Sequence, residues 1–233
     1  MSQSIVHGSP RGKGKVYMSI DVETDGPCVL SNSMLSFAVV VMDAATGEIL
    51  EELQQQLITL KGHTPDERTM KQFWELQPEA WKAATRRRVA PDTAMNRVAA
   101  LVRRLKAKGH DLEWVAKPSC FDWPWIKSYY EAFGPEWKPE IGFYCVDIRS
   151  KLKTFCDMTG QNSFEFVKKI TSGHPITHHA VDDAKNQAVL YFELSKRIAR
   201  AKSQARLPKT WKARQSSRAR CQTFLPDGKR LHV

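Results

Sequence analysis

The 233-residue sequence lacks any apolar run of the roughly 20 residues that a membrane-spanning helix needs. Its first 15 residues also lack the apolar segment of a secretory signal, so we expect an intracellular protein, cytoplasmic or nuclear. The five cysteines are scattered and form no CxxC pair, which argues against a disulfide framework and a cysteine-based zinc site. The glycine-containing segment 8–14 is too short for a P-loop, and Lys13 is not followed by Ser or Thr. These absences disfavour membrane, disulfide-rich and nucleoside-triphosphate-binding proteins.

Positive charge is concentrated at the two ends of the chain. The formal net charge is +11, of which residues 1–15 carry +3 and residues 199–233 carry +9. Basic ends on a nearly neutral body are typical of a protein that holds polyanions through phosphate contacts, although they serve solubility equally well. We expect a basic N-terminal segment over 1–15, one folded domain over 16–202 and a basic C-terminal tail over 203–233.

Hydrophobic periodicity predicts an α/β fold that begins with antiparallel strands. Val16–Glu23 alternates apolar and polar residues, as a strand does. Leu35–Asp43 and Glu48–Leu60 flank the turn signal Ala45-Thr46-Gly47 and indicate a hairpin. Between Asp66 and Gly109 the period becomes helical, with an apolar stripe that follows an expected cap at Asp92.

Strands and helices alternate in the second half of the sequence. The pattern predicts strands over 112–116 and 143–148, and helices over 125–133, 162–170 and 180–201. With the first three strands, this gives a mixed five-stranded sheet flanked by helices.

Asp21 and Glu23 lie two residues apart on the first predicted strand, so both side chains point to one face. Two carboxylates in this arrangement repel each other unless a cation lies between them. Mg²⁺ or Mn²⁺ suits them, because hard divalent ions prefer oxygen ligands. A solvated strand face is the ordinary alternative for an isolated DxE pair.

The segment 178–183, His-His-Ala-Val-Asp-Asp, leads from a loop into the last long helix. A histidine on the loop and an aspartate on the first helical turn can face one pocket, where an imidazole would take a proton from water. Alternatively, His179, Asp182 and Asp183 would only complement the helix dipole.

A third acidic residue, Asp122, lies among aromatic residues just after a predicted strand. It could serve a site or cap the following helix. Trp123 and Trp125 could stack nucleobases or pack in the core, and core packing is the more common role.

Together these three motifs resemble those of the DEDDh exonuclease superfamily, which includes ribonuclease T and the proofreading subunit of bacterial DNA polymerase III. The DxE motif of the first strand matches Asp21-Val22-Glu23, the aspartate at the start of a helix matches Asp122, and HxAxxD matches residues 178–183. The resemblance covers roughly residues 16–198. Lys117-Pro118 departs from it, because several relatives have a His-Asn pair there.

This resemblance implies a ribonuclease H-like fold and a 3′-to-5′ exonuclease that acts on single-stranded nucleic acid. Asp21, Glu23, Asp122 and Asp183 would hold two ions of Mg²⁺ or Mn²⁺, and His178 would deprotonate the attacking water. The resemblance also implies that Thr24, Met34 and Leu35 contact the substrate. Trp123 is a further candidate substrate contact, because aromatic side chains stack on bases in single-strand sites.

Two other functions compete with this interpretation. A nucleic-acid-binding module could keep the fold and lose catalysis, but all five catalytic positions hold competent residues. A metal phosphoesterase for small molecules is disfavoured by the basic ends and by the triplet at 86–88, which suit a polymer with many phosphates. RNA and DNA are not distinguished, and the oligomeric state is open, since some relatives are homodimers.

Overall fold

The computed structural model describes residues 14–171 and 177–204. The chain divides into one unit that ends at Ser195 and a second that begins at Lys196, of which only the last part of one helix is described. Nearly all of the predicted N-terminal segment and of the predicted C-terminal tail lies outside the described residues, so the predicted domain boundaries stay predictions.

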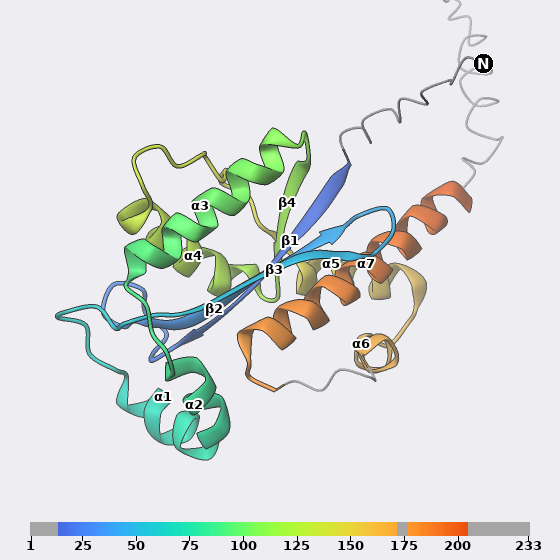
Figure 1. The fold of residues 1–233 in the computed structure, drawn as a ribbon. Coiled ribbons are helices and arrows are strands. Elements are labelled where there is room, and N and C mark those ends of the chain that lie inside the picture. Colours follow the sequence, from blue (N-terminus) through green and yellow to red (C-terminus); the bar gives the residue numbers. More distant parts are fainter. Residues whose placement is uncertain (1–13, 172–176, 205–233) are drawn as a thin grey trace, which may run out of the picture. The chain divides into compact units, whose positions relative to one another are not determined.

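A mixed five-stranded sheet forms the centre of the first unit, as the sequence predicts (Figure 1). The strand order is β3-β2-β1-β4-β5. Adjacent pairs in β3-β2-β1 are antiparallel, whereas β4 runs parallel to both β1 and β5. The strands are β1 Lys15–Thr24, β2 Met34–Asp43, β3 Ile49–Gln56, β4 Asp111–Ala116 and β5 Val146–Asp147.

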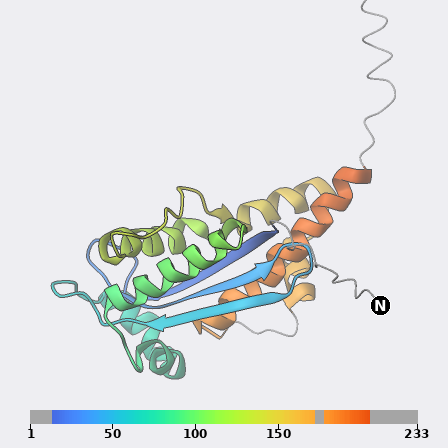
Figure 2. The same ribbon diagram turned by 45° about the horizontal axis from the view of Figure 1, so that its top comes forward.

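Helices cover both faces of this sheet (Figures 1 and 2). The main apolar core joins the sheet to α3 and α4, while the start of α7 lies on the opposite face. The helices are α1 Glu67–Gln72, the short 3₁₀ helix η1 Trp74–Leu76, α2 Pro78–Thr85, α3 Pro91–Ala107, α4 Ser119–Phe133, α5 Ile148–Thr159, α6 Ser163–Thr171 and α7 Ala180–Gln204. Within the described part of the chain, no helix has the length and apolar character to cross a bilayer.

The alternation of β1 divides its side chains between these two faces. Val16, Met18, Ile20 and Val22 enter the core beneath α3 and α4. The intervening side chains point toward α7, where the ring of Tyr17 contacts that of Tyr191 at a centroid distance of 4.7 Å. Asp21 and Glu23 therefore share the α7 face of the sheet.

Several element boundaries differ from the predictions. The strand predicted over 48–60 ends at Gln56, and the strand predicted over 143–148 contains only two residues. The helix predicted to begin at Trp125 begins at Ser119, because Pro124 is accommodated inside α4 instead of preceding it. Helix α5 was not predicted.

The predicted cap at Asp92 is also wrong. The N-cap of α3 is Ala90, and Asp92 lies within the first turn. Pro91 occupies the first helical position, where its missing N–H has no intrahelical partner to lose, so the helix begins before the acidic residue.

Candidate active site

Strand β1 carries Asp21 and Glu23 to the face that α7 covers. Asp21 is half-buried, and only 8% of Glu23 is exposed. The register with β2 shifts between Glu23 and Thr24, so the strand ends immediately after the two acidic residues. Their spacing on one strand brings both carboxylates to the same cluster, as expected from the DxE pattern.

Asp122 reaches this cluster from α4. The backbone N–H of Val22 donates a hydrogen bond of 3.2 Å to its Oδ1, which connects the start of α4 to β1. The side chain is buried, and Oδ2 has no hydrogen-bond partner among the described residues. Pro118, and not Asp122, is the N-cap of α4, so the helix-cap alternative for Asp122 is wrong.

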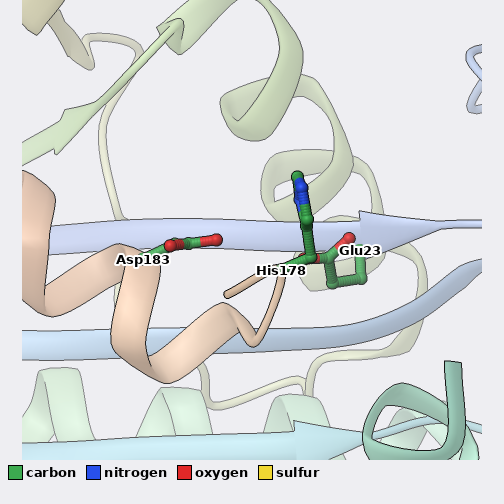
Figure 3. Close-up of side chains that lie close together, drawn as sticks. All are labelled: Glu23, His178 and Asp183. Atoms are coloured by element: carbon green, nitrogen blue, oxygen red, sulfur yellow. The ribbon is translucent and has the colours of Figure 1, made fainter. Parts of the chain in front are cut away.

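His178 and Asp183 complete the cluster from the start of α7. His178 lies on the preceding loop with a left-handed backbone at φ 53°, and Asp183 lies on the first helical turn. One ligand atom from each of Glu23, His178 and Asp183 lies within 4.8 Å of the other two (Figure 3). The loop, the helix and the strand thus direct three potential metal ligands to one point.

The neighbouring histidine and aspartate lie differently. His179 Nδ1 is 3.7 Å from Asp182 Oδ2, and the Thr177 hydroxyl donates a hydrogen bond of 3.4 Å to that same oxygen. His179 and Asp182 therefore interact with each other, whereas His178 and Asp183 lie with Glu23.

Burial and mutual repulsion raise the pKa values of the clustered carboxyl groups. Burial, then the carboxylates of Asp183 and Asp122, raise the pKa of Glu23 to about 8. Burial raises the pKa of Asp122 to about 7, although the Val22 N–H opposes this shift. The pKa of Asp21 is raised well above its ordinary value by burial and by its three acidic neighbours. Burial also raises the pKa of Asp183. The site therefore holds excess negative charge when all four groups ionise.

Gln187 belongs to the site, although no sequence motif identified it. Its Nε2 donates a hydrogen bond of 2.7 Å to Asp21 Oδ1. The side chain is 7% exposed, and its Oε1 has no partner within the part of the chain that the structure describes. Gln187 lies one helical turn after Asp183, so an i, i+4 search from that aspartate on α7 would have found it.

Two cavities adjoin the cluster on different sides. The first, of about 150 Å³, is lined by Asp21, Lys117, Val167, Thr171, Asp183, Asn186, Gln187 and Leu190. The second, of about 220 Å³, is lined by Val22, Glu23, Thr24, Gly26, Pro27, Thr69, Phe73 and Phe121. Since one touches Asp21 and Asp183 and the other touches Glu23, the carboxylates lie between two spaces.

Of the residues expected to contact substrate, one lines a cavity and two are buried in the core. Thr24 lines the second cavity, and its hydroxyl donates a hydrogen bond of 2.8 Å to the carbonyl of Gly26. Met34 and Leu35 are fully buried in two core clusters, so neither side chain offers a surface to a nucleobase in this conformation.

The tryptophans after Asp122 pack with other core residues. The ring centroid of Trp123 is 5.5 Å from that of Trp114, and only 1% of Trp125 is exposed. Neither residue lines either of the two cavities beside the carboxylates. Phe73 and Phe121, which sequence reasoning did not select, are the aromatic residues at the second cavity.

Solved structures show which fold this is. The nuclease domain of 3′hExo, described as a DEDDh family member bound to rAMP, has a TM-score of 0.56 and 14% identity, over 78% of this chain and 92% of that one. Cell-death related nuclease 4 (CRN-4) has a TM-score of 0.53 and 14% identity, over 78% and 64%. Exonuclease I of E. coli, in complex with a dT13 oligonucleotide, has a TM-score of 0.59 and 13% identity, over 81% and 43%. These likenesses confirm the ribonuclease H-like fold of DEDDh exonucleases.

No curated protein matches the sequence. A family model does match, and it covers residues 16–195, which include the whole carboxylate cluster, His178 and Gln187. The chain belongs to the Rv2179c-like 3′-5′ exoribonuclease domain family.

Proposed function

We propose that this protein is a metal-dependent exonuclease that removes nucleotides from the 3′ end of single-stranded RNA. The main support for this proposal is that ligand atoms of Glu23, His178 and Asp183 lie within 4.8 Å of one another. The half-buried Asp21 and the buried Asp122 lie beside them. The family description as an exoribonuclease supports both the 3′-to-5′ polarity and RNA as substrate. DNA is the second candidate, because exonuclease I, which shares the fold, holds a dT13 oligonucleotide.

Asp21, Glu23, Asp122 and Asp183 would hold two divalent ions, Mg²⁺ or Mn²⁺. The donor set fits such ions, because it consists of carboxylate oxygens whose mutual repulsion raises their pKa values. The buried Oδ2 of Asp122, which no described residue contacts by a hydrogen bond, fits a ligand position equally well. Bound ions would supply electrostatic stabilisation of the charge that develops on the phosphate during hydrolysis.

His178 would accept the proton of the attacking water. Its ring packs edge-on against Phe73, with centroids 4.8 Å apart and planes at 90°, so the imidazole is held in one orientation. The carboxylate of Asp183 lies close enough to favour the protonated imidazole that forms as the proton is transferred. A neutral imidazole is the required starting form for this proton transfer.

The second cavity would receive the 3′-terminal nucleotide. Phe73 and Phe121 offer aromatic surface on which one unpaired base would stack, and Thr24 lies beside them. Because Glu23 lines the same cavity, a nucleotide bound there would place its 5′ phosphate at the carboxylates. This placement favours a single-stranded 3′ end over a paired one.

A catalytically inactive binding module is the alternative function. A module that only binds nucleic acid has no need for a buried, mutually repelling carboxylate cluster with a histidine at its edge. The observed convergence therefore favours catalysis.

The experiment that tests this function uses 5′-labelled single-stranded RNA and DNA oligomers with Mg²⁺, Mn²⁺ or EDTA. We expect a ladder that shortens by one nucleotide from the 3′ end, faster for RNA, and no product in EDTA. Undiminished hydrolysis in excess EDTA would refute the metal requirement. A protein that binds RNA but never cleaves it would be the inactive module.

A further inference from the structure

Two basic residues, Lys117 and Arg149, follow adjacent strands at the same edge of the sheet, next to the carboxylate cluster. Lys117 follows β4 directly, and Arg149 is the second residue of α5, which follows β5. β4 and β5 are parallel neighbours, with Ala116 opposite Asp147. The carboxyl ends of adjacent parallel strands are where open α/β sheets bind ligands.

Lys117 extends into the first cavity, beside Asp21 and Asp183. It is half-buried. Burial and the positive charge of Arg149 lower its pKa, whereas Asp183 raises it, so both charged groups act on the ammonium. Two like charges held near each other are costly unless an anion joins them.

Neither cation has such an anion among the described residues. No carboxylate in residues 14–171 or 177–204 lies within 4.0 Å of Lys117 Nζ or of the Arg149 guanidinium, whereas Lys15, Lys71, Lys127 and Lys153 each have a carboxylate partner at that distance. The pair thus offers positive charge to a ligand at the edge of a negatively charged site.

The position of this pair relates it to the path of the substrate strand. The cavity with Phe73 and Phe121 lies on the Glu23 side of the cluster, and the cavity with Lys117 touches Asp21 and Asp183. If the terminal nucleotide occupies the second cavity and the scissile phosphate lies at the carboxylates, the strand continues toward Lys117 in the first cavity.

We propose that Lys117 and Arg149 bind the phosphate that follows the scissile phosphate toward the 5′ end, and thereby favour substrates with at least three nucleotides over a dinucleotide. This inference rests on the proposed exonuclease function. A trinucleotide with a 5′ hydroxyl has that second phosphate, whereas a dinucleotide has only the scissile one.

The test compares cleavage of these two substrates by Lys117→Met and Arg149→Gln variants. We expect each variant to raise the KM for the trinucleotide roughly tenfold and to reduce the preference for trinucleotide over dinucleotide by a similar factor, as expected for loss of a charge-assisted contact. Lys117→Arg should retain most of the preference. Lys82→Met, on the exposed surface of α2, is the matched control and should leave the cleavage of both substrates unchanged.

A substrate modification tests the same contact from the other side. A methylphosphonate at the 5′ linkage of the trinucleotide removes the charge of the second phosphate. The unaltered protein should have a roughly tenfold lower kcat/KM on this substrate than on the normal trinucleotide. The Lys117→Met variant should show little difference between the two substrates, because it already lacks the contact. The salt dependence of oligonucleotide binding should weaken by about 0.7 in log–log slope for each cation removed.

The outcomes separate this inference from the proposed function. An equal loss of activity on both substrates would place the two cations at the scissile phosphate and so overturn the inference. An unchanged preference for the trinucleotide in both variants would also overturn it. Thermal unfolding checks that each variant folds, and the exposed Arg149 provides a second variant if Lys117→Met is unstable. If the unaltered protein cleaves neither substrate, the proposed function fails instead.

Discussion

Gln187 on α7 donates a hydrogen bond of 2.7 Å to Oδ1 of Asp21 on β1. This bond lowers the pKa of Asp21, and so favours the ionised carboxylate, while burial and three acidic neighbours act in the opposite direction. Asp183 lies one turn earlier on the same helix. The hydrogen bond from Gln187 therefore also fixes the position of Asp21 relative to Asp183. We interpret Gln187 as a positioning residue for Asp21, one of the proposed metal ligands.

Gln187→Met should therefore weaken metal binding, because methionine keeps the length of the side chain but has no N–H to donate. Loss of a hydrogen bond to a metal ligand typically costs about 10–100-fold in metal affinity or activity. Titration calorimetry with Mn²⁺ measures the affinity directly, without substrate. Gln161→Met, at an exposed position between α5 and α6, is the control. An unchanged Mn²⁺ affinity in Gln187→Met would show that Asp21 needs no such support.

The two consecutive aspartates of α7 should differ sharply in importance. Asp183→Asn removes a carboxylate that lies with Glu23 and His178, so we expect nearly complete loss of exonuclease activity. Asp182→Asn changes only a residue that contacts His179 and Thr177, so substantial activity should remain. Initial rates on a labelled oligomer measure both. The reverse ranking would mean that the assignment of the cluster is shifted by one residue.

A parallel ranking is expected for the two histidines. His178→Ala should reduce kcat by about 10²–10⁴-fold, the usual contribution of a general base. His179→Ala should have a much smaller effect, since His179 lies beside Asp182 and not in the cluster. Single-turnover rates distinguish loss of chemistry from loss of binding. Equal defects in both variants would contradict the role given to His178.

The predictable parts of the fold are those with strong local patterns. The alternation of β1 and the turn at Gly47, whose φ is 77°, are visible as local patterns in the sequence. The first two strands and the start of the third were therefore predicted to within one residue. The strand predicted over 143–148 was too long and helix α5 was missed, because tertiary context decided both. β5 is held by only two register pairs with β4, and α5 follows it directly, so neither has a local signal that separates strand from helix.

The same distinction applies to the site. Asp21, Glu23, Asp122, His178 and Asp183 were predictable because their residue types and spacing form motifs. The positions of Gln187, Phe73 and Phe121 beside the cluster were not predictable, because these positions depend on which elements pack together. Conversely, the burial of Met34 and Leu35 in the core arises from the packing of β2, which the motif-based expectation of a base contact did not consider.

The basic C-terminal tail gives a prediction that depends on charge alone. Residues 199–233 carry +9, whereas residues 16–198 carry −1, so phosphate contacts away from the site should come largely from the tail. Truncation after Leu207 should raise the KM for a long oligonucleotide at low salt, with little change in kcat or in cleavage of a dinucleotide. Steady-state kinetics at several salt concentrations measure this effect. An identical KM and salt dependence in the truncated protein would give the tail another role.

The metal-free protein should lose stability as the pH rises. Folding raises the pKa of Glu23 from 4.5 to about 8 and that of Asp122 from 3.8 to about 7. Below about pH 3 these groups are protonated in both the folded and the unfolded chain and contribute no difference. Above that pH the unfolded chain releases its protons first, so the folded state becomes progressively less favourable until the pH exceeds the folded pKa values, near 8.

Thermal unfolding in EDTA should therefore show a Tm that falls between about pH 3 and about pH 8, after correction for groups elsewhere in the chain. Glu23→Gln should reduce this fall, because the amide has no proton to lose, whereas the exposed Glu79→Gln should not. Mg²⁺ or Mn²⁺ added at pH 8 should raise the Tm, since these ions bind the ionised carboxylates of the folded state alone. A Tm that responds to neither Glu23→Gln nor the metal would mean that the four acidic side chains do not form one repelling, cation-binding cluster.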